Sequence, residues 1–472
     1  MSRKSKAMAV LRLSPKELTR TTWILSTMPS SQSSSLLRKL NVIYHPALVW
    51  VFRVVIGAVF IVSGFAKGID PWGSYYKIGE YLDVWGWDIP SALVVLAAFA
   101  LGSFEFVWGC LLALGCYRRV AVWLLLLMMA FMLPLTLYIV VADPVADCGC
   151  FGDFLIISNT ATFLKNVVIT LFLLYLAVFN SRVDGLFFPY VQWVVGGLVT
   201  LYIVIISMIG FNVQPLIDFR RFGPEVSLIP VDNDSEDDSD FEVDYEFIYE
   251  KDGRQQSFSI DNLPDSTWTF VDRKVVGGGS EELSDGFSVI ADGEDIAADI
   301  ISPDSEQFLV TVPDMRGVDL SYTYLLNELN TFITGRGGSM VAIVNGNDDD
   351  IEWWRDVSMA SYPIYSAEPT MIKELARGRA AIVYLKDGVV EWKRTLSSIS
   401  YPTVTGTPAG ELLSVLDPEP TYYLYLLSIT FAGIIFIIMV LDRSGRLVAW
   451  HIRYHRRSKR RWKEPNSDET QL

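Results

Sequence analysis

The stretch RVVIGAVFIVSGFAKGIDP, residues 53–71, sets an apolar run between an arginine and a lysine. With the apolar residues before it, the run is about 20 residues long, enough for a helix to cross a hydrocarbon core of about 30 Å. It therefore predicts a membrane span. Five further runs of similar length predict a multi-pass α-helical membrane protein, whose spans we place at Ala47–Phe65, Ala92–Leu114, Val120–Val141, Ala161–Phe179, Tyr190–Ile209 and Tyr422–Leu441.

The composition agrees with this class. Hydrophobic residues make up 51% of the 472 positions, which is more typical of a membrane protein than of a cytosolic one. The spans divide the chain into segments with different compositions. We expect a basic N-terminal segment (1–46), a four-helix membrane bundle (47–180), a fifth span (188–210), an acidic linker with a β-rich segment (211–305), an α/β domain (306–420), a sixth span (422–441) and a basic tail (442–472).

Lysine and arginine indicate on which side the ends of the chain lie. They are concentrated in the head, at the Arg118–Arg119 connection and in the tail after Leu441. Basic connections of this kind stay on the cytoplasmic side of a membrane. The sequence therefore predicts a bacterial inner-membrane protein with both termini in the cytoplasm and residues 211–420 in the periplasm. The head lacks the compact apolar core and cleavage site of a signal peptide.

Acidic residues are concentrated in the predicted periplasmic part. Residues 211–420 hold about 40 of the 54 Asp and Glu residues against about 15 Lys and Arg, which leaves about 25 net negative charges there. This charge argues against nucleic-acid binding. The stretch SEDDSDFEVDYE, residues 235–246, begins as a solvated acidic linker. The basic tail suits contact with anionic membrane lipids.

Residues 211–420 alternate apolar and polar positions and carry turn signals. YEFIYEKDGRQQSFSI, residues 245–260, predicts two strands joined by a Lys-Asp-Gly turn. The stretches STWTFVDRKVV, FSVI, ADGED and DIAADII continue the β pattern. From Glu306 onward the order becomes β-α-β-α-β-β, with a final hairpin that turns at Asp387 and Gly388.

This order resembles the thioredoxin fold, but the redox groups of that fold are missing. Residues 211–420 contain no cysteine, and PDMRGVDLSYTY stands where redox-active thioredoxins have a Cys-x-x-Cys pair. The stretch ARGRAAIVYL also lacks the proline that normally precedes the third strand. The domain cannot exchange thiols and disulfides by itself. A binding or docking module is the better interpretation.

Two of the four cysteines lie one residue apart in DCGCFGD, between the third and fourth predicted spans. This loop faces the predicted periplasm, an oxidising compartment. A disulfide between Cys148 and Cys150 would close a very small ring, so it would be a poor staple and easily reduced. Gly149 would permit the tight turn. The pair is our candidate catalytic site, with exchange as its chemistry.

Other interpretations of the pair stay open. Soft metals bind adjacent thiols but usually recruit His or further Cys, and the three histidines map to the cytoplasmic side. We therefore predict no metal site. An inert reduced pair beside a turn is a further alternative. Asp147 and Asp153 would raise a nearby thiol pKa unless the N-terminus of the next helix offsets them.

Ionisable residues inside spans are costly in lipid and normally have a partner. Arg53 and Glu105 fall at similar predicted depths, so we expect them to form an intramembrane polar pair, either a structural salt bridge or part of a proton path or a site for a polar head group. Lys67 and Lys165 flank the predicted periplasmic span ends. Snorkelling explains each lysine alone; together they are candidates for drawing an anionic or quinone-like group towards the cysteine pair.

Cys110 and Cys116 lie in the cytoplasmic half of the second span. They are a membrane thickness away from Cys148 and Cys150, which argues against a direct relay between the pairs. We interpret them as buried small hydrophobes.

Several motifs together resemble a known family. The stretch at residues 53–71, the glutamate of GSFEFVWGCLLALG and the motif CGCFGD are similar to DoxX-like, MauE-type membrane proteins. The motifs QPLIDFR, FIYEKDG and PDSTWTFV, followed by a thioredoxin-like domain and a last span, resemble a Bacteroidota subgroup of them. The resemblance covers about residues 41–450.

MauE-type proteins are associated with methylamine utilisation and are thought to support disulfide formation or electron supply for exported proteins. Some DoxX relatives act in thiol or sulfur chemistry coupled to quinone. The resemblance implies redox roles for Cys148 and Cys150. No pattern here points to methylamine, and the long acidic domain departs from short MauE proteins.

Three functions follow as hypotheses. The first is a thiol–disulfide or electron-transfer component that acts on an exported partner protein with thiols, with a quinone as the candidate electron carrier. The chain has no dinucleotide-binding or haem-ligand motif. The second is a non-enzymatic scaffold that binds an envelope protein through its thioredoxin-like domain. The third, a solute transporter, lacks paired broken helices or internal repeats.

Overall fold

The computed structural model describes residues 45–142, 144–145, 148–155, 157–229, 245–251, 254–259, 269–275, 287, 289–291 and 294–461. The basic head, Asp147 and the acidic stretch 235–244 lie outside the described residues. Predictions made for them are therefore not addressed by the structure.

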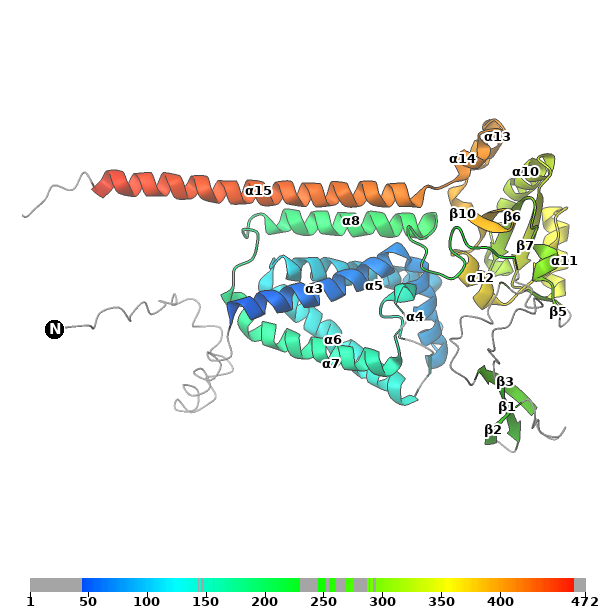
Figure 1. Cartoon of the computed structure of the whole chain (residues 1–472), viewed down its shortest axis with the longest axis horizontal. Helices are drawn as coiled ribbons and strands as arrows, with labels where there is room; N and C mark the ends of the chain where they lie inside the picture. Colours follow the sequence, from blue (N-terminus) through cyan, green and yellow to red (C-terminus); the bar gives the residue numbers. More distant parts are fainter. Residues whose placement is uncertain are drawn as a thin grey trace, which may run out of the picture.

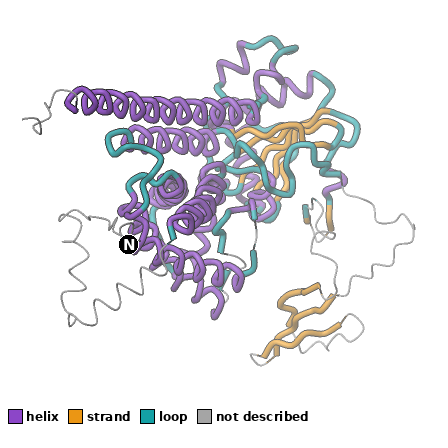
Figure 2. Tube along the Cα trace, turned by 60° about the vertical axis from the view of Figure 1, so that its left-hand side comes forward, coloured by secondary structure: helices purple, strands orange, loops and turns teal. Residues whose placement is uncertain are grey.

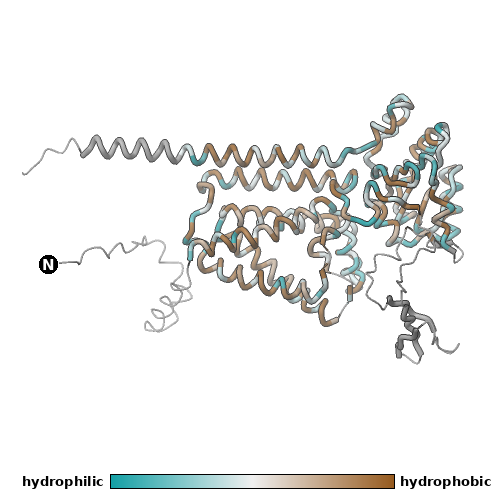
Figure 3. The backbone as a smooth tube through the Cα atoms, in the orientation of Figure 1, coloured by the Kyte–Doolittle hydropathy of each residue, from teal (hydrophilic) through white to brown (hydrophobic). Residues whose placement is uncertain are grey.

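Among the residues that the structure describes, six helices are long and apolar enough to cross a membrane, which confirms the predicted spans and the multi-pass helical class. They are α3 Pro46–Ile69, α5 Ser91–Ala113, α6 Arg118–Ala142, α7 Asn159–Phe179, α8 Gln192–Asn212 and α15 Pro420–Arg461. Figure 3 shows apolar residues along all six. Their directions place the loop after α6 and the domain between α8 and α15 at the same end of the helices (Figure 1).

Glycines bring α3 and α5 into unusually close contact. A Cβ atom on Gly64 would lie 2.3 Å from the backbone nitrogen of Phe106, and one on Gly57 would lie 2.9 Å from the carbonyl oxygen of Gly109. Small residues allow such close approach, which gains packing contacts that lipid cannot supply. The glycines therefore also fix which residues of the two helices lie level with each other.

A helix that we had not predicted lies between the first two spans. Helix α4, Pro71–Trp85, begins after Asp70, whose carboxylate accepts a hydrogen bond of 2.9 Å from the nitrogen of Gly73. It ends at Gly86, which adopts the left-handed conformation with φ 66°. A capping Asp, a proline at the first position and a terminal glycine are helix signals that the sequence carried.

Helices α8 and α15 run side by side at the edge of the bundle (Figure 1). The hydroxyl groups of Tyr202 and Ser428 are 2.8 Å apart, and the ring of Tyr202 stacks on Phe431 with centroids 4.3 Å apart. Most other apolar residues of α15 are exposed, which suits a helix that faces lipid.

The domain between α8 and α15 is built on a five-stranded mixed sheet with the order β10-β9-β6-β7-β8. Its strands are β6 Glu306–Val312, β7 Ser339–Val344, β8 Ile364–Ser366, β9 Ala381–Lys386 and β10 Val389–Thr395. Strands β6, β7 and β8 are parallel, and β9 and β10 are antiparallel. The predicted final hairpin turns at Asp387 and Gly388, both with positive φ.

Helices cover both faces of this sheet, as Figure 2 shows from a second side. One face packs on α10 Tyr322–Gly335, α11 Asp348–Ser358, α13 Tyr401–Gly406 and α14 Leu412–Leu416. The other face packs on α12 Pro369–Leu375 and α9 Ala297–Ile300. The predicted strand DIAADII is wrong in part, because α9 forms within it and directs Ala297 and Ile300 into the core.

A separate three-stranded antiparallel sheet precedes this domain. It consists of β1 Tyr245–Lys251, β2 Arg254–Ser259 and β3 Thr269–Val275, in the order β2-β1-β3. The predicted pairing of the first two strands is confirmed. The last residue of FSVI and three residues of ADGED form a short ladder, β4 Ile290–Ala291 with β5 Glu294–Asp295.

The contact between α3 and α5 predicts a specific sensitivity to small substitutions. Gly64→Ala forces a methyl group against the backbone of α5, so we expect a loss of about 1–3 kcal/mol in stability. Gly197→Ala on α8 meets nothing within 4 Å and serves as the matched control. Thermal unfolding in detergent measures both. An equal melting temperature for the two variants would show that this contact is not tight.

Candidate functional site

The cysteine pair lies in the loop between α6 and α7. All four cysteines of the chain are free thiols, and the Sγ atoms of Cys148 and Cys150 are 2.8 Å apart. Gly149 adopts φ 66°, and a Cβ atom there would lie 2.7 Å from Cγ of Lys77. A side chain at this position would therefore meet both an unfavourable backbone conformation and a steric clash. The structure brings the two thiols into direct contact.

Helix α4 covers this loop from one side. The hydroxyl group of Tyr81 donates a hydrogen bond of 3.2 Å to the carbonyl oxygen of Cys148, and the Lys77 stem lies over Gly149. Tyr81 and Cys148 also share a small apolar cluster with Ile139 on α6. Cys148 is 8% exposed, whereas Cys150 is partly exposed. Cys148 is thus the more buried of the two residues.

A buried ion pair supports the loop from the bundle side. Lys67 Nζ lies 2.9 Å from Glu105 Oε2, and the two residues are 4% and 2% exposed. Lys67 also donates to the hydroxyl group of Ser63 at 2.8 Å and to the carbonyl oxygen of Cys150. Ser63 Oγ lies 2.6 Å from Glu105 Oε2 and 2.6 Å from that same carbonyl oxygen. The pair is therefore both neutralised and tied to the cysteine loop.

The second candidate lysine approaches the loop from α7. Lys165 Nζ lies 4.3 Å from the centre of the Phe151 ring, directly after Cys150 in the chain. A cation over an aromatic ring is attracted by the negative face of the ring. Lys67 and Lys165 thus both have protein partners beside the cysteines. Their positions support an electrostatic role on the thiols, and we assign no quinone-binding step to them.

Charge and hydrogen bonding separate the two thiols chemically. With Cys148 as the donor, its hydrogen bond lowers the pKa of Cys150 to about 7; burial and the negative charge of Glu105 oppose this shift, and the positive charges of Lys165 and Lys67 favour it. The same hydrogen bond, together with burial, raises the pKa of Cys148. A thiolate is the nucleophile in sulfur exchange. Cys150 is therefore suited to attack, and Cys148 holds its proton.

The predicted pair of Arg53 and Glu105 is wrong. Arg53 donates to the side chain of Asn180, to its carbonyl oxygen at 2.6 Å and to that of Val183 at 2.7 Å. The close contact of α3 and α5 places Gly115, not Glu105, level with Arg53. The two charged residues thus lie at different depths. Arg53 satisfies carbonyl groups at the end of α7, as cations near helix C-termini do.

Cys110 and Cys116 lie among apolar side chains of α5 and α8, including Val195 and Tyr202. Both are free and buried, and neither contributes to the cysteine loop. Within the described residues, no three His, Cys, Asp or Glu side chains are grouped as a metal site requires.

A cleft of about 1610 Å³ lies between α4 and the domain that connects α8 to α15, which we call the soluble domain. Tyr76 and Lys77 line it on the bundle side, and Asp314 and Arg377 line it from the loops after β6 and before β9. The residue Asp153, three positions after Cys150, also lines it. The cleft exceeds the volume of a typical small-molecule pocket.

Sequence reasoning missed Ser63, Lys77, Tyr81 and Arg377. Ser63 carried a signal, because it precedes Lys67 by four residues and must lie on the same helix face. Lys77 and Tyr81 were missed together with α4. Arg377 carried no local signal, since its partners come from distant parts of the chain.

The ion pair gives a testable expectation for stability. Lys67→Met leaves the Glu105 carboxylate buried without its cation, which should cost about 3–5 kcal/mol. The double change Lys67→Met with Glu105→Met should recover part of this loss. Asp184→Asn removes an exposed surface pair and should cost about 1 kcal/mol or less. Melting temperatures in detergent that are equal for Lys67→Met and Asp184→Asn would contradict the assignment.

Comparison with known families addresses the bundle and the small sheet. Residues 45–179 match the family described as methylamine utilisation protein MauE, and residues 243–276 match a domain of unknown function, DUF8463. No curated protein and no solved structure matches the chain. The first match runs from α3 to α7 and includes Lys67, Glu105 and both cysteines of the loop. It supports a MauE-like membrane family for this part of the chain, which holds four of the candidate spans.

Proposed function

We propose that this protein is a membrane component of a redox system that exchanges thiols and disulfides with a partner protein through Cys148 and Cys150. One observation carries the proposal: two free thiols lie 2.8 Å apart in a loop that buried charges support. The match of residues 45–179 to the MauE family is consistent with a membrane component of this kind.

The proposed reaction uses only the two thiols and the partner. The Cys150 thiolate attacks one sulfur of a partner disulfide, which forms a mixed disulfide and releases the first partner thiolate. Cys148 then loses its proton and attacks Cys150 Sγ, which closes the loop disulfide and releases the second partner thiolate. Two electrons pass from the loop to the partner. Run in reverse, the same steps oxidise two partner thiols.

The surroundings of the loop support each step of this reaction. Lys165 and Lys67 favour the attacking thiolate of Cys150, and the Cys148 thiol stabilises it by a hydrogen bond. Gly149 allows the chain to turn between the sulfurs. The ring of only two cysteines and one glycine holds the disulfide under strain, which keeps it reducible.

We place the cysteine loop and the soluble domain on the periplasmic side of a bacterial inner membrane. The basic connections and termini support this orientation, and an oxidising compartment suits the chemistry. The strand order β10-β9-β6-β7-β8 supports a thioredoxin-like domain that has β8 as an additional edge strand. Without cysteines, such a domain would bind the partner and leave the chemistry to the bundle.

The cleft favours a second candidate, a scaffold that binds an envelope protein without redox chemistry. It lies between α4 and the soluble domain and is large enough for a polypeptide segment. The full chain with Cys148→Ser and Cys150→Ser separates the two functions. A scaffold would bind its partner and support the host as well as the unchanged protein does.

Replacement of Cys148, the cysteine that resolves the mixed disulfide, should trap the partner on Cys150. In Cys148→Ser, Cys150 can still attack, but the mixed disulfide has no neighbouring thiol to resolve it. We expect adducts of higher mass on non-reducing gels of membranes, which disappear on reduction. Cys150→Ser and the buried control Cys110→Ser should give none. Absence of adducts from Cys148→Ser, or equal adducts from Cys150→Ser, would contradict the proposed exchange.

The rate of alkylation of Cys150 should depend on pH with a midpoint near its pKa of about 7. Because the thiolate reacts, the rate should rise as the pH passes through 7 and then level off. Cys148→Ala removes the hydrogen-bond donor and should move the midpoint upward, whereas Cys148→Ser keeps a donor and should move it less. Mass spectrometry of the labelled peptide measures the rate. A midpoint near 9 in the unchanged protein would show that the loop does not activate Cys150.

A further inference from the structure

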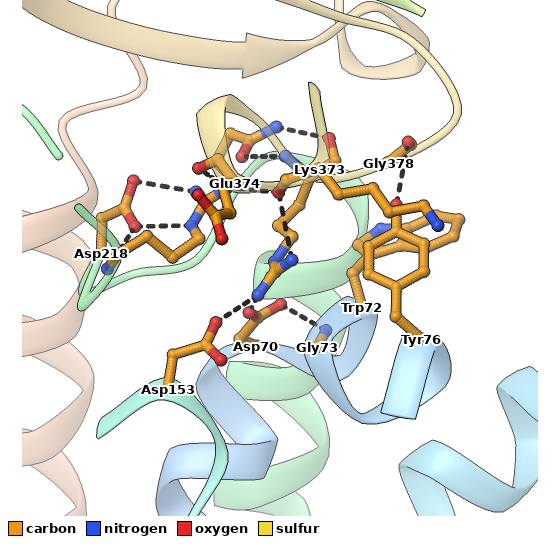
Figure 4. A network of polar contacts seen from close by, with 12 residues as sticks. Asp70, Trp72, Gly73, Tyr76, Asp153, Asp218, Lys373, Glu374 and Gly378 are labelled. Atoms are coloured by element: carbon orange, nitrogen blue, oxygen red, sulfur yellow. Dashed lines mark hydrogen bonds and ion pairs between the residues drawn. The ribbon is translucent and has the colours of Figure 1, made fainter. Parts of the chain in front are cut away.

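An arginine of the soluble domain contacts two carboxylates of the membrane bundle. Arg377 lies in the turn between α12 and β9 and is 7% exposed. Its Nε atom donates to Asp70 Oδ2 at 2.9 Å, and its Nη2 atom donates to Asp153. Figure 4 shows Asp70 and Asp153 side by side below Lys373 of α12 and Gly378 of the turn after it. A single guanidinium group therefore joins two parts of the bundle to the domain.

Arg377 is itself held firmly on the domain side. Its backbone nitrogen donates to the side chain of Gln214 at 3.2 Å, and its carbonyl oxygen accepts from the same side chain at 2.8 Å. Its Nη1 atom donates to the carbonyl oxygen of Lys373 at 3.1 Å. Its guanidinium carbon lies 5.4 Å from the ring centre of Tyr76. The position of the guanidinium group is therefore set by the soluble domain and α4 together.

Of the two carboxylates that Arg377 contacts, one belongs to the cysteine loop and the other lies at the start of α4, the helix that covers this loop. Asp153 lies in the short helix η1, Gly152–Phe154, and follows Cys150 by three residues. Asp70 caps α4, the helix that carries Lys77 and Tyr81 over the loop. An arginine can hold two carboxylates in one fixed geometry because its donors form a rigid planar fork.

We propose that Arg377 is a positioning residue, through which the soluble domain holds the Cys148–Cys150 loop against α4. The proposal rests on the exchange function proposed for this loop. It assigns the cysteine-free domain a direct part in that chemistry: the domain determines how the two thiols face each other. Arg377 and Asp153 both line the cleft, so a partner bound there would touch this contact.

Loss of the contact has a consequence that differs from simple unfolding. When Asp153 is released, the loop can turn away from α4, and Cys148 no longer points its thiol steadily at Cys150. Cys150 should then titrate closer to an ordinary thiol, near 8.5. Unfolding would instead speed alkylation at every pH.

The test measures the alkylation of Cys150 in the full chain against pH, using N-ethylmaleimide and mass spectrometry. Arg377→Gln and Asp153→Asn should raise the midpoint and slow alkylation at pH 7 on the order of tenfold, with an unchanged or faster rate at high pH. Loss of the Asp153 negative charge would by itself lower the midpoint, so a rise in Asp153→Asn reports the position of the loop and not the charge. Arg377→Lys should give an intermediate midpoint, because lysine keeps the charge without the fork. Asp153→Asn leaves the pair with Asp70 intact, which keeps the test valid if Arg377→Gln folds poorly.

Arg336→Gln is the matched control. It breaks an ion pair with Glu306, with Nε and Oε2 2.7 Å apart, on the exposed surface of the same domain, and it should leave the profile unchanged. An unshifted midpoint in both Arg377→Gln and Asp153→Asn, or faster alkylation at every pH without a shift, would overturn the positioning role. The profile needs no partner protein. The positioning role can therefore be overturned without affecting the exchange function, which depends on the trapping result for Cys148→Ser.

Discussion

The contact between α3 and α5 determines where the charges of the bundle meet. Glycines at positions 57 and 64 let the two helices approach until backbone atoms touch, and this sets Ser63 and Lys67 level with Glu105. The resulting ion pair is costly to bury, yet it has hydrogen-bond partners on several sides. One of these partners is the carbonyl oxygen of Cys150. The packing of α3 on α5 thus determines the position of the buried ion pair, and the ion pair in turn supports the cysteine loop.

The loop receives support from three directions, and each direction has a different physical effect. The bundle supplies positive charge through Lys67 and Lys165, which favours a thiolate. Helix α4 covers the loop through Tyr81, which keeps Cys148 buried. The soluble domain adds a rigid contact through Arg377. A second ion-pair network holds the segment after α8 to strand β10. The Asp218 carboxylate lies 2.7 Å from Arg220 and 2.9 Å from Lys393, and these two positive charges lower its pKa to about 2, although burial alone would raise it.

Features that depend on local sequence patterns could be predicted well, whereas contacts between distant segments could not. The six spans follow from run length, because lipid requires continuous apolar helices. The final hairpin follows from Asp387 and Gly388, and the placement of the cysteine pair in a loop follows from the span boundaries. The predicted pairing of Arg53 with Glu105 was wrong. The depth of each residue in the membrane was counted from the predicted helix ends, and such a count does not include how the glycine contacts align α3 with α5. Helix α4 was missed although Asp70, Pro71 and Gly86 marked its ends. The reach of Arg377 to Asp153 depends on how the domain sits on the bundle, which no local pattern encodes.

The central claim is that Cys148 and Cys150 alternate between dithiol and disulfide while the other two cysteines stay reduced. Thiol trapping in isolated membranes tests it most directly, with rapid acid quenching, alkylation and mass spectrometry before and after addition of an oxidant or a reductant. The account predicts that the loop pair shifts between the two states and that Cys110 and Cys116 remain free thiols throughout, since both are buried in the bundle. A loop pair that stays fully reduced under every condition would contradict it.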